Sequence, residues 1–418
     1  MFGMIQFGEK TLPVVDADSH VVEPADVWTS RVSSKFADVV PRVVFNPRTS
    51  HHHWRIGSRY IWPAAYWATA GVDSYPPEVS WEFEDVDRGT FDPVERLKRM
   101  DQYGIDIQVL YPNIVGFESQ TLLSELGPDV ALLCTRVYND FLVEWCSADP
   151  HRLIPIAMLP WWDVAASTAE MRRCVALGHR GVLFANKFER AGLPVSTDPY
   201  WDPVYGTAEE LGVSVNFHVG FASSDLSETM KNAMAETERR EVAKRNAVSE
   251  GSHDTTESYD FDPRRTAAYA TSVLMSQGDV LGRLLASGLC DRFESLQLVA
   301  IESGFGYMPF YLECLDWHWR AFGGHRYSSM PPSEYFRRQC YGTFWFERTT
   351  LRLLDLFENN FMFSTDYPHS TSLSPGPASP ALPAAVHLAE AFKDIDPQIA
   401  AKAVSLNAQR LYHLGRDT

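Results

Sequence analysis

Short apolar runs rich in Val, Ile, Leu and Phe recur along the chain, and amphipathic segments separate most of them. Continuous apolar runs of this length are typical of parallel strands that helices cover on both faces. Eight such runs predict an α/β fold in which eight parallel strands close into a (β/α)8 TIM barrel. The expected strands lie at about 13–18, 105–110, 153–159, 181–185, 213–218, 296–301, 341–346 and 361–365.

The segments between these runs carry helix start and stop signals. In "FDPVERLKRMDQYGID", Asp92 is in the N-cap position, Pro93 opens the helix and Gly104 ends it before the next strand. The segments "DVAASTAEMRRCVALGHRG" and "DPVYGTAEELGV" repeat the order of helix, glycine and strand. The pattern therefore alternates between strand and helix over most of the chain.

Two insertions interrupt this alternation. Residues 24–91 follow the first strand and contain "PRVVFNPRTSHHHWRIGSRYIW", whose alternation predicts a hairpin with a turn near 46–50 or at Gly57. Catalytic loops of a barrel follow its strands, so this insertion is expected to act as a lid. Residues 221–265 are polar and charge-dense, which predicts an exposed helix and a loop. No linker divides the chain, and we expect one domain over 1–418.

Composition narrows the class of partner. The chain has 418 residues, of which 45% are hydrophobic, and 37 Lys and Arg stand against 54 Asp and Glu, giving a net charge of −17. This balance argues against nucleic acid and anionic membranes as partners, and leaves a small-molecule substrate. No apolar stretch is long enough to span a membrane. The six scattered cysteines and a start without signal-peptide features predict a cytoplasmic protein.

Polar residues at the carboxyl ends of the expected strands are the candidates for chemistry. The first strand ends in "DADSH", which contains Asp18 and His20, and two later strands end at His218 and Asp366. Each residue alone could be a turn cap or a satisfied core histidine. Together, two carboxylates and two imidazoles at one barrel mouth form a suitable set of ligands for a divalent metal ion.

These residues lie in four segments that resemble the amidohydrolase superfamily. The segments are "DADSHVVEP", "VSVNFHVG", "LQLVAIESGFGYMPFYLECLD" and "FMFSTDYPH", and their order resembles the amidohydrolase-related group that includes aminocarboxymuconate-semialdehyde decarboxylase and γ-resorcylate decarboxylase. The resemblance implies a barrel with one divalent metal held by Asp18, His20, His218 and Asp366. Zn²⁺ is the first expectation, with Mn²⁺ or Fe²⁺ as alternatives.

The chain departs from this family pattern at two positions. Asp18 replaces the first His of the pair, and an oxygen ligand makes manganese, or another ion that tolerates oxygen ligands, a suitable alternative beside zinc. Glu302 stands where the better-known decarboxylases carry a His. Glu302 is a candidate catalytic acid and base, with a metal ligand or a structural carboxylate as alternatives. His369 is a second candidate, either orienting a ligand or touching substrate, with an ordinary loop histidine as the alternative.

Other polar residues receive weaker assignments. Asp16 and Glu23 lie beside Asp18 and His20 of the first strand and are expected to support their geometry by hydrogen bonds. Lys187 is expected to contact substrate or solvent. The run at 51–53 does not predict a three-histidine site, because neighbouring strand residues point to opposite faces. His253 is expected at the surface of the second insertion.

The sequence leaves three functions open. The leading hypothesis is a metal-dependent hydrolase of a small, aromatic or cyclic substrate, with metal-activated water and acid–base roles for Asp366 and Glu302. The alternative is a metal-dependent non-oxidative decarboxylase of an aromatic or unsaturated carboxylic acid. The third is a barrel without catalysis that binds a partner. A homodimer is expected, with the apolar helix at 271–289 between the subunits.

Overall fold

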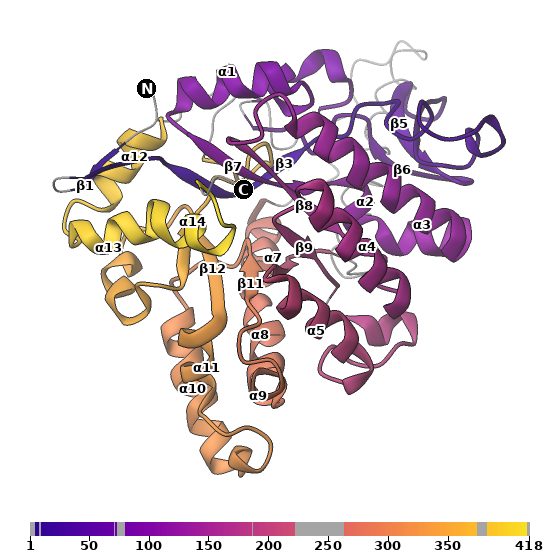
Figure 1. Ribbon diagram of the computed structural model, residues 1–418. Coiled ribbons are helices and arrows are strands. Elements are labelled where there is room, and N and C mark those ends of the chain that lie inside the picture. The colour runs from indigo at the N-terminus through magenta and orange to yellow at the C-terminus, as the bar shows by residue number, and fades with distance from the viewer. Residues whose placement is uncertain are drawn as a thin grey trace.

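The computed structural model of the chain describes residues 5–7, 10–70, 72, 80–185, 187–221, 263–373 and 383–415. Its centre is a sheet of eight parallel strands surrounded by helices (Figure 1). Along the sheet the strands follow one another in chain order, from β3 to β13. The eight strands are β3 Val15–Val21, β7 Ile107–Pro112, β8 Leu153–Met158, β9 Gly181–Leu183, β10 Ser214–His218, β11 Leu298–Ile301, β12 Cys340–Phe344 and β13 Phe361–Phe363.

The first and last strands meet and nearly close the sheet into a barrel. The N–H of His20 donates to the carbonyl of Tyr367 at 2.6 Å, and the N–H of Asp366 donates to the carbonyl of Asp18 at 2.9 Å. A parallel bridge joins Ser19 and Tyr367 in the same place. Each of the eight expected apolar runs therefore contains a strand, and the barrel fold is confirmed.

The strands form because their side chains are buried on both faces. All six residues of β8 are buried, as its continuous apolar sequence predicts. All seven residues of β3 are buried too, although Asp16, Asp18 and His20 are polar. The register between β3 and β7 also shifts between Asp16 and Ser19. Burying polar groups is costly unless they find partners. The buried polar residues of β3 therefore indicate that this strand contributes side chains to a functional site.

The helices lie outside the strands, and α1 shows which residues make such a helix begin and end. Helix α1 begins after Asp92, whose side chain accepts from the N–H groups of Val94 and Glu95. It ends at Gly104, which has a φ of 75°. The helices are α1 Pro93–Tyr103, α2 Ile114–Phe117, α3 Ser119–Cys146, α4 Val164–Leu177, α5 Asp202–Leu211, α7 Pro263–Met275, α8 Gln277–Ala286, α9 Leu289–Arg292, α10 Met308–Ala321, α11 Pro332–Gln339, α12 Ala384–Ala391, α13 Pro397–Ala401 and α14 Asn407–Leu411.

Residues 24–91 contain a second, antiparallel sheet of three strands, β4 Arg42–Asn46, β5 His51–Ile56 and β6 Arg59–Pro63. Both expected turns exist, since one joins β4 to β5 and the other joins β5 to β6. The loop after β6 reaches the barrel, where the N–H groups of Thr69 and Ala70 donate to the carbonyl of Pro368. A further antiparallel pair, β1 Ile5–Phe7 and β2 Lys10–Leu12, precedes β3.

The insertion expected at 221–265 lies outside the described residues from 222 to 262, and His253 with it. The helix expected between subunits contains α8, whose apolar side chains are buried within this chain: Val280, Leu281, Leu284 and Leu285. That apolar face is therefore not available to a second subunit. All six cysteines are free thiols. Among the described residues, no helix combines the length and the apolar character that crossing a membrane requires.

Candidate metal centre

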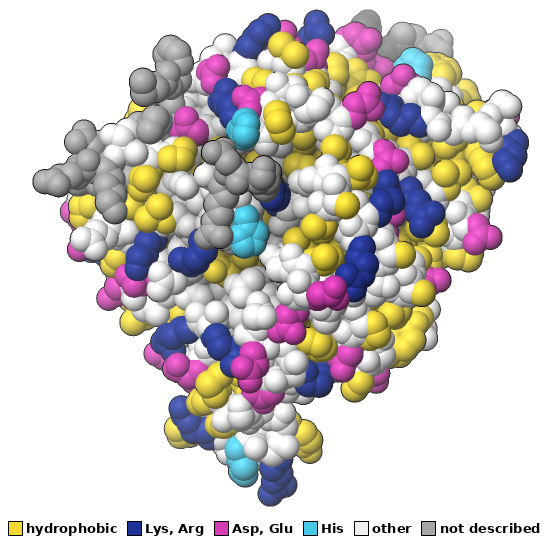
Figure 2. Space-filling model, in the orientation of Figure 1, with side chains coloured by type: hydrophobic (Ala, Val, Ile, Leu, Met, Phe, Trp, Pro, Cys, Tyr) yellow, Lys and Arg dark blue, Asp and Glu magenta, His cyan; other side chains and the backbone are white. Residues whose placement is uncertain are grey.

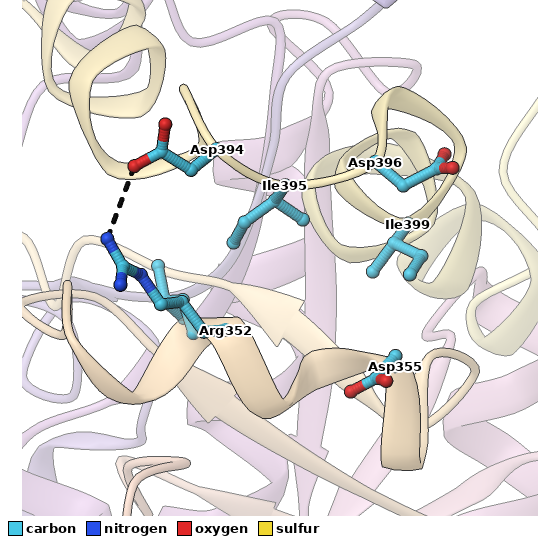
Figure 3. Close-up of a pocket in the computed structure, with 7 residues that line it drawn as sticks. Arg352, Asp355, Asp394, Ile395, Asp396 and Ile399 are labelled. Atoms are coloured by element: carbon cyan, nitrogen blue, oxygen red, sulfur yellow. Dashed lines mark hydrogen bonds and ion pairs between the residues drawn. The ribbon is translucent and has the colours of Figure 1, made fainter.

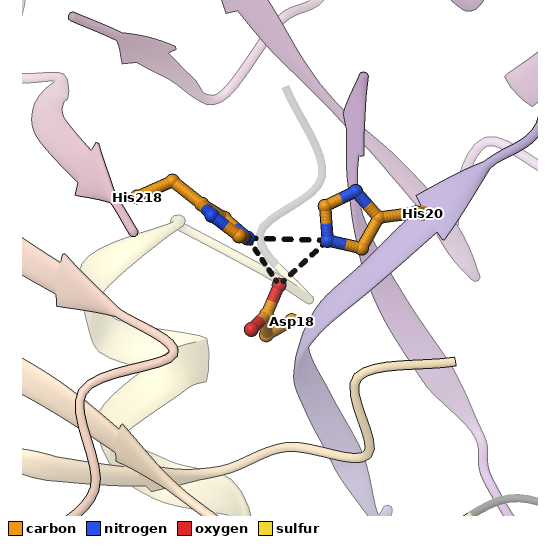
Figure 4. A group of neighbouring side chains, drawn as sticks. All are labelled: Asp18, His20 and His218. Atoms are coloured by element: carbon orange, nitrogen blue, oxygen red, sulfur yellow. Dashed lines mark hydrogen bonds and ion pairs between the residues drawn. The ribbon is translucent and has the colours of Figure 1, made fainter. Parts of the chain in front are cut away.

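Three of the expected ligands meet at the carboxyl ends of β3 and β10 (Figure 4). The Nε2 atoms of His20 and His218 lie 3.1 Å apart. Asp18 Oδ1 lies 3.6 Å from Nε2 of His20 and 3.5 Å from Nε2 of His218. All three side chains are buried, so one ligand atom from each faces a small space closed to solvent.

Hydrogen bonds to the backbone decide which nitrogen of each imidazole faces this space. His20 Nδ1 lies 3.2 Å from the carbonyl of Pro112, and His218 Nδ1 lies 2.8 Å from the carbonyl of Val219. Because a carbonyl oxygen only accepts, both Nδ1 atoms donate and both neutral rings present an Nε2 lone pair. Both oxygens of Asp18 are buried without a hydrogen bond.

These lone pairs repel one another unless a cation or proton lies among them. Imidazole nitrogens and a carboxylate oxygen are ligands that Zn²⁺ and Mn²⁺ accept. An imidazole whose other nitrogen donates to a carbonyl is also how proteins hold metal-binding histidines. The side chains present therefore fit a divalent metal ion.

Asp366 completes the group from the segment after β13. Its Oδ1 is buried without a hydrogen bond and lies 3.8 Å from His20 Nε2. Its Oδ2 accepts from Thr371 Oγ1 at 2.6 Å. His20, Asp366 and His369 form a second group with metal-ligand spacing, because His369 Nδ1 lies 2.7 Å from Asp366 Oδ1.

Glu302 lies beside the histidines at the end of β11. Its Oε2 is 3.8 Å from His218 Nδ1, and its side chain is 19% exposed while those of Asp18 and His218 are 0% and 1% exposed. Of the carboxylates of Asp18, Asp366 and Glu302, that of Glu302 is therefore the one that keeps some contact with solvent.

Glu302 and Asp366 are held in an unusual backbone conformation, with φ values of 53° and 57°. Residues other than glycine rarely adopt positive φ, and such strain gathers at functional sites. The N–H of Glu302 donates to Thr343 Oγ1 at 2.8 Å, which helps to hold this conformation.

Burial shifts the pKa values of the group. Burial raises the pKa of Asp18, against the opposing charge of His218. Burial lowers the pKa of His20 well below its usual value, and the charges of His369 and His218 act in the same direction. Burial acts to lower the pKa of His218, but the charge and hydrogen bonding of Asp18, together with the Val219 carbonyl and the charge of Asp366, raise this pKa above its usual value. Burial raises the pKa of Glu302 well above its usual value, and the charges of Asp366 and Asp18 add to it.

Asp16 and Glu23 support the centre without entering it. Asp16 accepts from the N–H of Thr365 at 2.8 Å, from Thr365 Oγ1 at 2.6 Å and from Gln108 Nε2 at 2.9 Å. It thereby ties β3 to the segment that carries Asp366. Glu23 Oε1 accepts from the N–H groups of Asn113 and Ile114 at 3.0 and 2.9 Å.

Sequence reasoning missed Asn113 and Arg96. Asn113 Nδ2 donates to the carbonyl of Val21 at 3.0 Å, so its Oδ1 accepts from Nε2 of His369 at 2.8 Å. Buried Arg96 donates to the carbonyl of His20 at 2.6 Å. Asn113 directly follows β7, so the same strand-end rule that selected His218 identifies it. Arg96 lies within α1, where no sequence signal marks it.

Aromatic rings surround the histidines. The Phe117 ring centroid lies 5.9 Å from that of His20, 5.5 Å from that of His218 and 4.8 Å from that of Trp67. The ring of Trp67 also lies 5.2 Å from that of His369. Trp67 comes from the insertion that follows β3, so part of the predicted lid forms a wall of the centre.

The other candidate residues lie apart from this group. His51 and His52 each lie within 3.4 Å of a Glu82 oxygen, whereas His53 is buried beside Thr49. A surface pocket of about 440 Å³ lies elsewhere, and its lining includes an ion pair between Arg352 and Asp394 (Figure 3). None of the residues of the metal centre lines it.

The chain is similar to known proteins in sequence and in structure. The family profile described as amidohydrolase matches residues 16–414. A γ-resorcylate decarboxylase of Rhizobium sp. (strain MTP-10005) is 27% identical over 292 residues, which cover 65% of this chain and 76% of the relative.

Solved structures share the fold at low sequence identity. An amidohydrolase from Mycobacterium avium subsp. paratuberculosis K-10 is similar with a TM-score of 0.69 and 18% identity, over 96% of this chain and 99% of that chain. A dihydroxybenzoic acid decarboxylase from Polaromonas sp. JS666, solved with bound manganese and the inhibitor 2-nitroresorcinol, is similar with a TM-score of 0.56 and 18% identity, over 97% of this chain and 98% of that chain.

Proposed function

The chain belongs to the amidohydrolase family, and we propose that it is a metal-dependent, non-oxidative decarboxylase of a small aromatic carboxylic acid. The resemblance drawn from the four sequence segments is thus confirmed, as is the expectation of an enzyme of this superfamily. The relatives and the site together support the finer statements that follow.

One observation carries the proposal: two imidazole lone pairs and an unpaired carboxylate converge in a buried space. In the proposed centre Asp18, His20, His218 and Asp366 hold one divalent metal ion. Such an ion, when bound, supplies Lewis-acid stabilisation of a substrate carboxylate and a neighbouring hydroxyl oxygen. Manganese is the preferred candidate over zinc, because two of the four ligands are carboxylates and the Polaromonas decarboxylase binds manganese.

Decarboxylation requires a proton donor for the ring carbon. The bond between the ring and the carboxylate breaks, the electron pair stays on the ring carbon, and CO₂ leaves when that carbon takes a proton. Glu302 is suited to deliver this proton, because burial raises its pKa and its side chain is the partly exposed carboxylate of the group. The ring of Phe117, with Trp67 behind it, excludes water from this side of the histidines.

The site also assigns a role to His369. Asn113 accepts from its Nε2, so the neutral ring turns the lone pair of Nδ1 toward Asp366 Oδ1, and a proton or a cation must hold these two atoms together. We assign His369 to positioning this carboxylate.

Hydrolysis was the leading hypothesis from sequence, and the comparisons support decarboxylation better. Glu302, at a position where the better-known decarboxylases carry a His, is the departure from the family pattern that favours hydrolysis. A carboxyl group with a raised pKa performs the same proton delivery, so that argument loses its force. The curated relative is a decarboxylase of an aromatic acid that carries hydroxyl groups beside its carboxylate.

The test is a product assay with 2,6-dihydroxybenzoate. We expect the purified chain, stripped by a chelator and reloaded with Mn²⁺ or Zn²⁺, to release CO₂ and resorcinol, and the stripped chain to release neither. As a control, the double variant Asp18→Asn/His218→Asn is expected to lose both bound metal and activity. Hydrolysis of an ester or amide panel by the metal-loaded chain, without CO₂ release from any hydroxybenzoate, would overturn the proposal in favour of a hydrolase.

A further inference from the structure

Arg96 is the only buried lysine or arginine of the described residues, with 1% of its surface exposed. Figure 2 shows that Lys and Arg side chains commonly lie at the surface, several of them beside Asp or Glu. Each acceptor of the Arg96 guanidinium is instead neutral: the carbonyls of Gly89, Thr90 and His20 and the side chain of Gln108. Burying a cation without a carboxylate beside it is costly, so a role beyond packing is expected for Arg96.

One hydrogen bond of Arg96 fixes the backbone of His20. Nη2 of Arg96 donates to the carbonyl of His20 at 2.6 Å, and the N–H of His20 donates to the carbonyl of Tyr367 at 2.6 Å. Both backbone groups of His20 are therefore held at the point where its imidazole enters the proposed centre. Ligand atoms must be held to within about 0.5 Å, so this support bears directly on metal binding.

The guanidinium of Arg96 also contacts the segment that carries Asp366. Its carbon lies 4.5 Å from the centroid of the Tyr367 ring, which is a cation–π contact. Tyr367 directly follows Asp366, whose N–H donates to the carbonyl of Asp18 at 2.9 Å. The same side chain therefore holds His20 on one side and the neighbour of Asp366 on the other.

A relay of hydrogen bonds through Gln108 reaches the other neighbour of Asp366. Nη1 of Arg96 donates to Gln108 Oε1 at 3.0 Å, and Gln108 Nε2 donates to Asp16 Oδ2 at 2.9 Å. Asp16 accepts from the N–H and the hydroxyl of Thr365, which directly precedes Asp366. Arg96 is thus connected to both neighbours of Asp366, whose φ of 57° is held only by its surroundings.

We propose that Arg96 is a positioning residue of the metal centre, which sets the distance between the ligand atoms of His20 and Asp366. A guanidinium is suited to this role, because it is planar and its N–H groups point in fixed directions. A lysine at this position would keep the charge but not these directions. The inference rests on the metal centre proposed above and is independent of the reaction performed there.

Arg96→Lys tests the directed hydrogen bonds at constant charge. We expect its dissociation constant for Mn²⁺, measured by competition with a chromophoric chelator, to rise by at least about tenfold. The visible absorption spectrum of the Co²⁺-loaded chain should also differ from that of the wild-type chain, because this spectrum depends on how the ligands are arranged around the ion.

Arg152→Lys is the matched control. Arg152 donates to the carbonyls of Asp106 and Ile105 at 2.8 and 3.1 Å, beside the start of β7 and therefore at the end of the barrel away from the centre. Loss of such bonds should lower the free energy of unfolding in both variants. The Mn²⁺ affinity and the cobalt spectrum should change only in Arg96→Lys.

Gln108→Met tests the relay while Arg96 itself is retained, and it decides the question if Arg96→Lys does not fold. Methionine has a similar size but neither accepts from Arg96 nor donates to Asp16, so we expect the dissociation constant for Mn²⁺ to rise about tenfold. Gln339→Met is its control, because buried Gln339 accepts from Arg338 at 2.9 Å and donates to two backbone carbonyls, before β12 begins. This variant should bind Mn²⁺ like the wild-type chain.

Wild-type Mn²⁺ affinity in a folded Arg96→Lys variant, or in Gln108→Met, would overturn the proposal. So would equal losses of affinity in these variants and in their controls, because such losses would reflect stability alone. A wild-type chain that binds no Mn²⁺ would overturn it together with the proposed centre. A chain that shows the expected affinities but releases no CO₂ would support the role of Arg96 and contradict only the proposed reaction.

Discussion

His20 and His218 each use one ring nitrogen for a backbone carbonyl, which leaves the other nitrogen without a proton inside the centre. Substituting either histidine by a polar side chain without an imidazole removes a lone pair that no neighbouring side chain replaces. Asp18 adds a carboxylate that no hydrogen bond satisfies. At the scale of single residues, the centre is therefore a set of acceptors without donors, and it is stable only with a cation or added protons.

Glu302→Gln tests the proton donor directly. The amide cannot release a proton, so we expect kcat for 2,6-dihydroxybenzoate to fall by about 10²- to 10⁴-fold with unchanged metal content. Glu302→His should retain more activity, because an imidazolium also donates a proton. Both quantities are measured on the same preparation, by steady-state kinetics and elemental analysis.

Glu347 provides the control for this prediction. Its buried carboxylate accepts from the N–H groups of Phe305 and Trp345, so Glu347→Gln should lower thermal stability more than kcat. If Glu302→Gln turned over at the wild-type rate, the acid role would be wrong. If it lost its metal, Glu302 would be a ligand.

Asn113→Leu tests the link between His369 and the metal centre. Leucine has a similar size but cannot accept from His369 Nε2, so the ring is free to turn away from Asp366. We expect the affinity for Mn²⁺ to fall by about 10- to 100-fold, as is usual when a partner of a ligand is removed. Competition with a chromophoric chelator measures this affinity without any assay of turnover.

Asn113→Asp is the comparison variant, because aspartate keeps the acceptor for His369, while it replaces the donor to Val21 by a second oxygen and adds a negative charge. It should bind metal more tightly than Asn113→Leu. Equal affinity in the wild-type chain and in Asn113→Leu would show that His369 does not act through Asp366.

At the scale of elements, the proposed metal centre depends on how β3, β7 and β13 meet. Asp16 connects β3 to Thr365 and Gln108, and Glu23 connects the end of β3 to the start of α2. Helix α2 carries Phe117, whose ring lies beside both histidines. The buried carboxylates of Asp16 and Glu23 thus fix the positions of the strands and the helix that carry the side chains of the centre.

Glu23 gives this support a measurable pH dependence. Burial raises the pKa of Glu23 from 4.5 to about 8, so the folded chain holds a proton that the unfolded chain releases between these values. The stability that this proton provides is fully present below pH 4.5 and is lost as the pH rises toward 8. Glu23→Gln keeps the acceptor for the N–H groups of Asn113 and Ile114 but does not titrate.

We therefore expect the free energy of unfolding to fall less steeply between pH 5 and pH 8 in Glu23→Gln than in the wild-type chain. Urea denaturation at several pH values measures both slopes, and their difference isolates residue 23 from other titrating groups. Identical slopes would mean that Glu23 is ionised in the folded chain.

The elements themselves could be predicted well from sequence, and their details less so. Eight continuous apolar runs predicted the eight strands, because a strand that is buried on both faces is apolar at successive positions. The register shift between Asp16 and Ser19 could not be predicted, since it arises from pairing with β7. The ligand candidates at strand ends were found because polar residues interrupt apolar runs. Arg96 could not be predicted as part of the site, because its contact with the His20 carbonyl links segments that are 76 residues apart in the sequence.

At the scale of the whole molecule, the proposed metal centre joins segments that are far apart in the chain. Asp18 and His20 come from the first barrel strand, His218 from β10 and Asp366 from the segment after the last strand. An ion held by all of them binds only the folded chain, since the unfolded chain does not bring these groups together. Binding and global stability are therefore linked.

This linkage predicts that added Mn²⁺ raises the unfolding temperature of the chelator-treated chain. An ion at 100 times its dissociation constant stabilises the folded state by about 2.7 kcal/mol, which corresponds to a shift of several degrees or less for a chain of this size. The shift should grow with the logarithm of the Mn²⁺ concentration. It should shrink in acid, because imidazole and carboxylate ligands bind a metal only when unprotonated. Differential scanning calorimetry measures both dependences.

The double variant Asp18→Asn/His218→Asn separates this site from weak binding elsewhere on an acidic surface. It removes two of the four proposed ligands, so its unfolding temperature should not respond to Mn²⁺. His51→Asn is the matched control, because His51 is a half-buried histidine outside the centre, and this variant should respond like the wild-type chain. An equal response in the double variant would place the bound ion away from Asp18 and His218, and the proposed centre would then lose its physical basis.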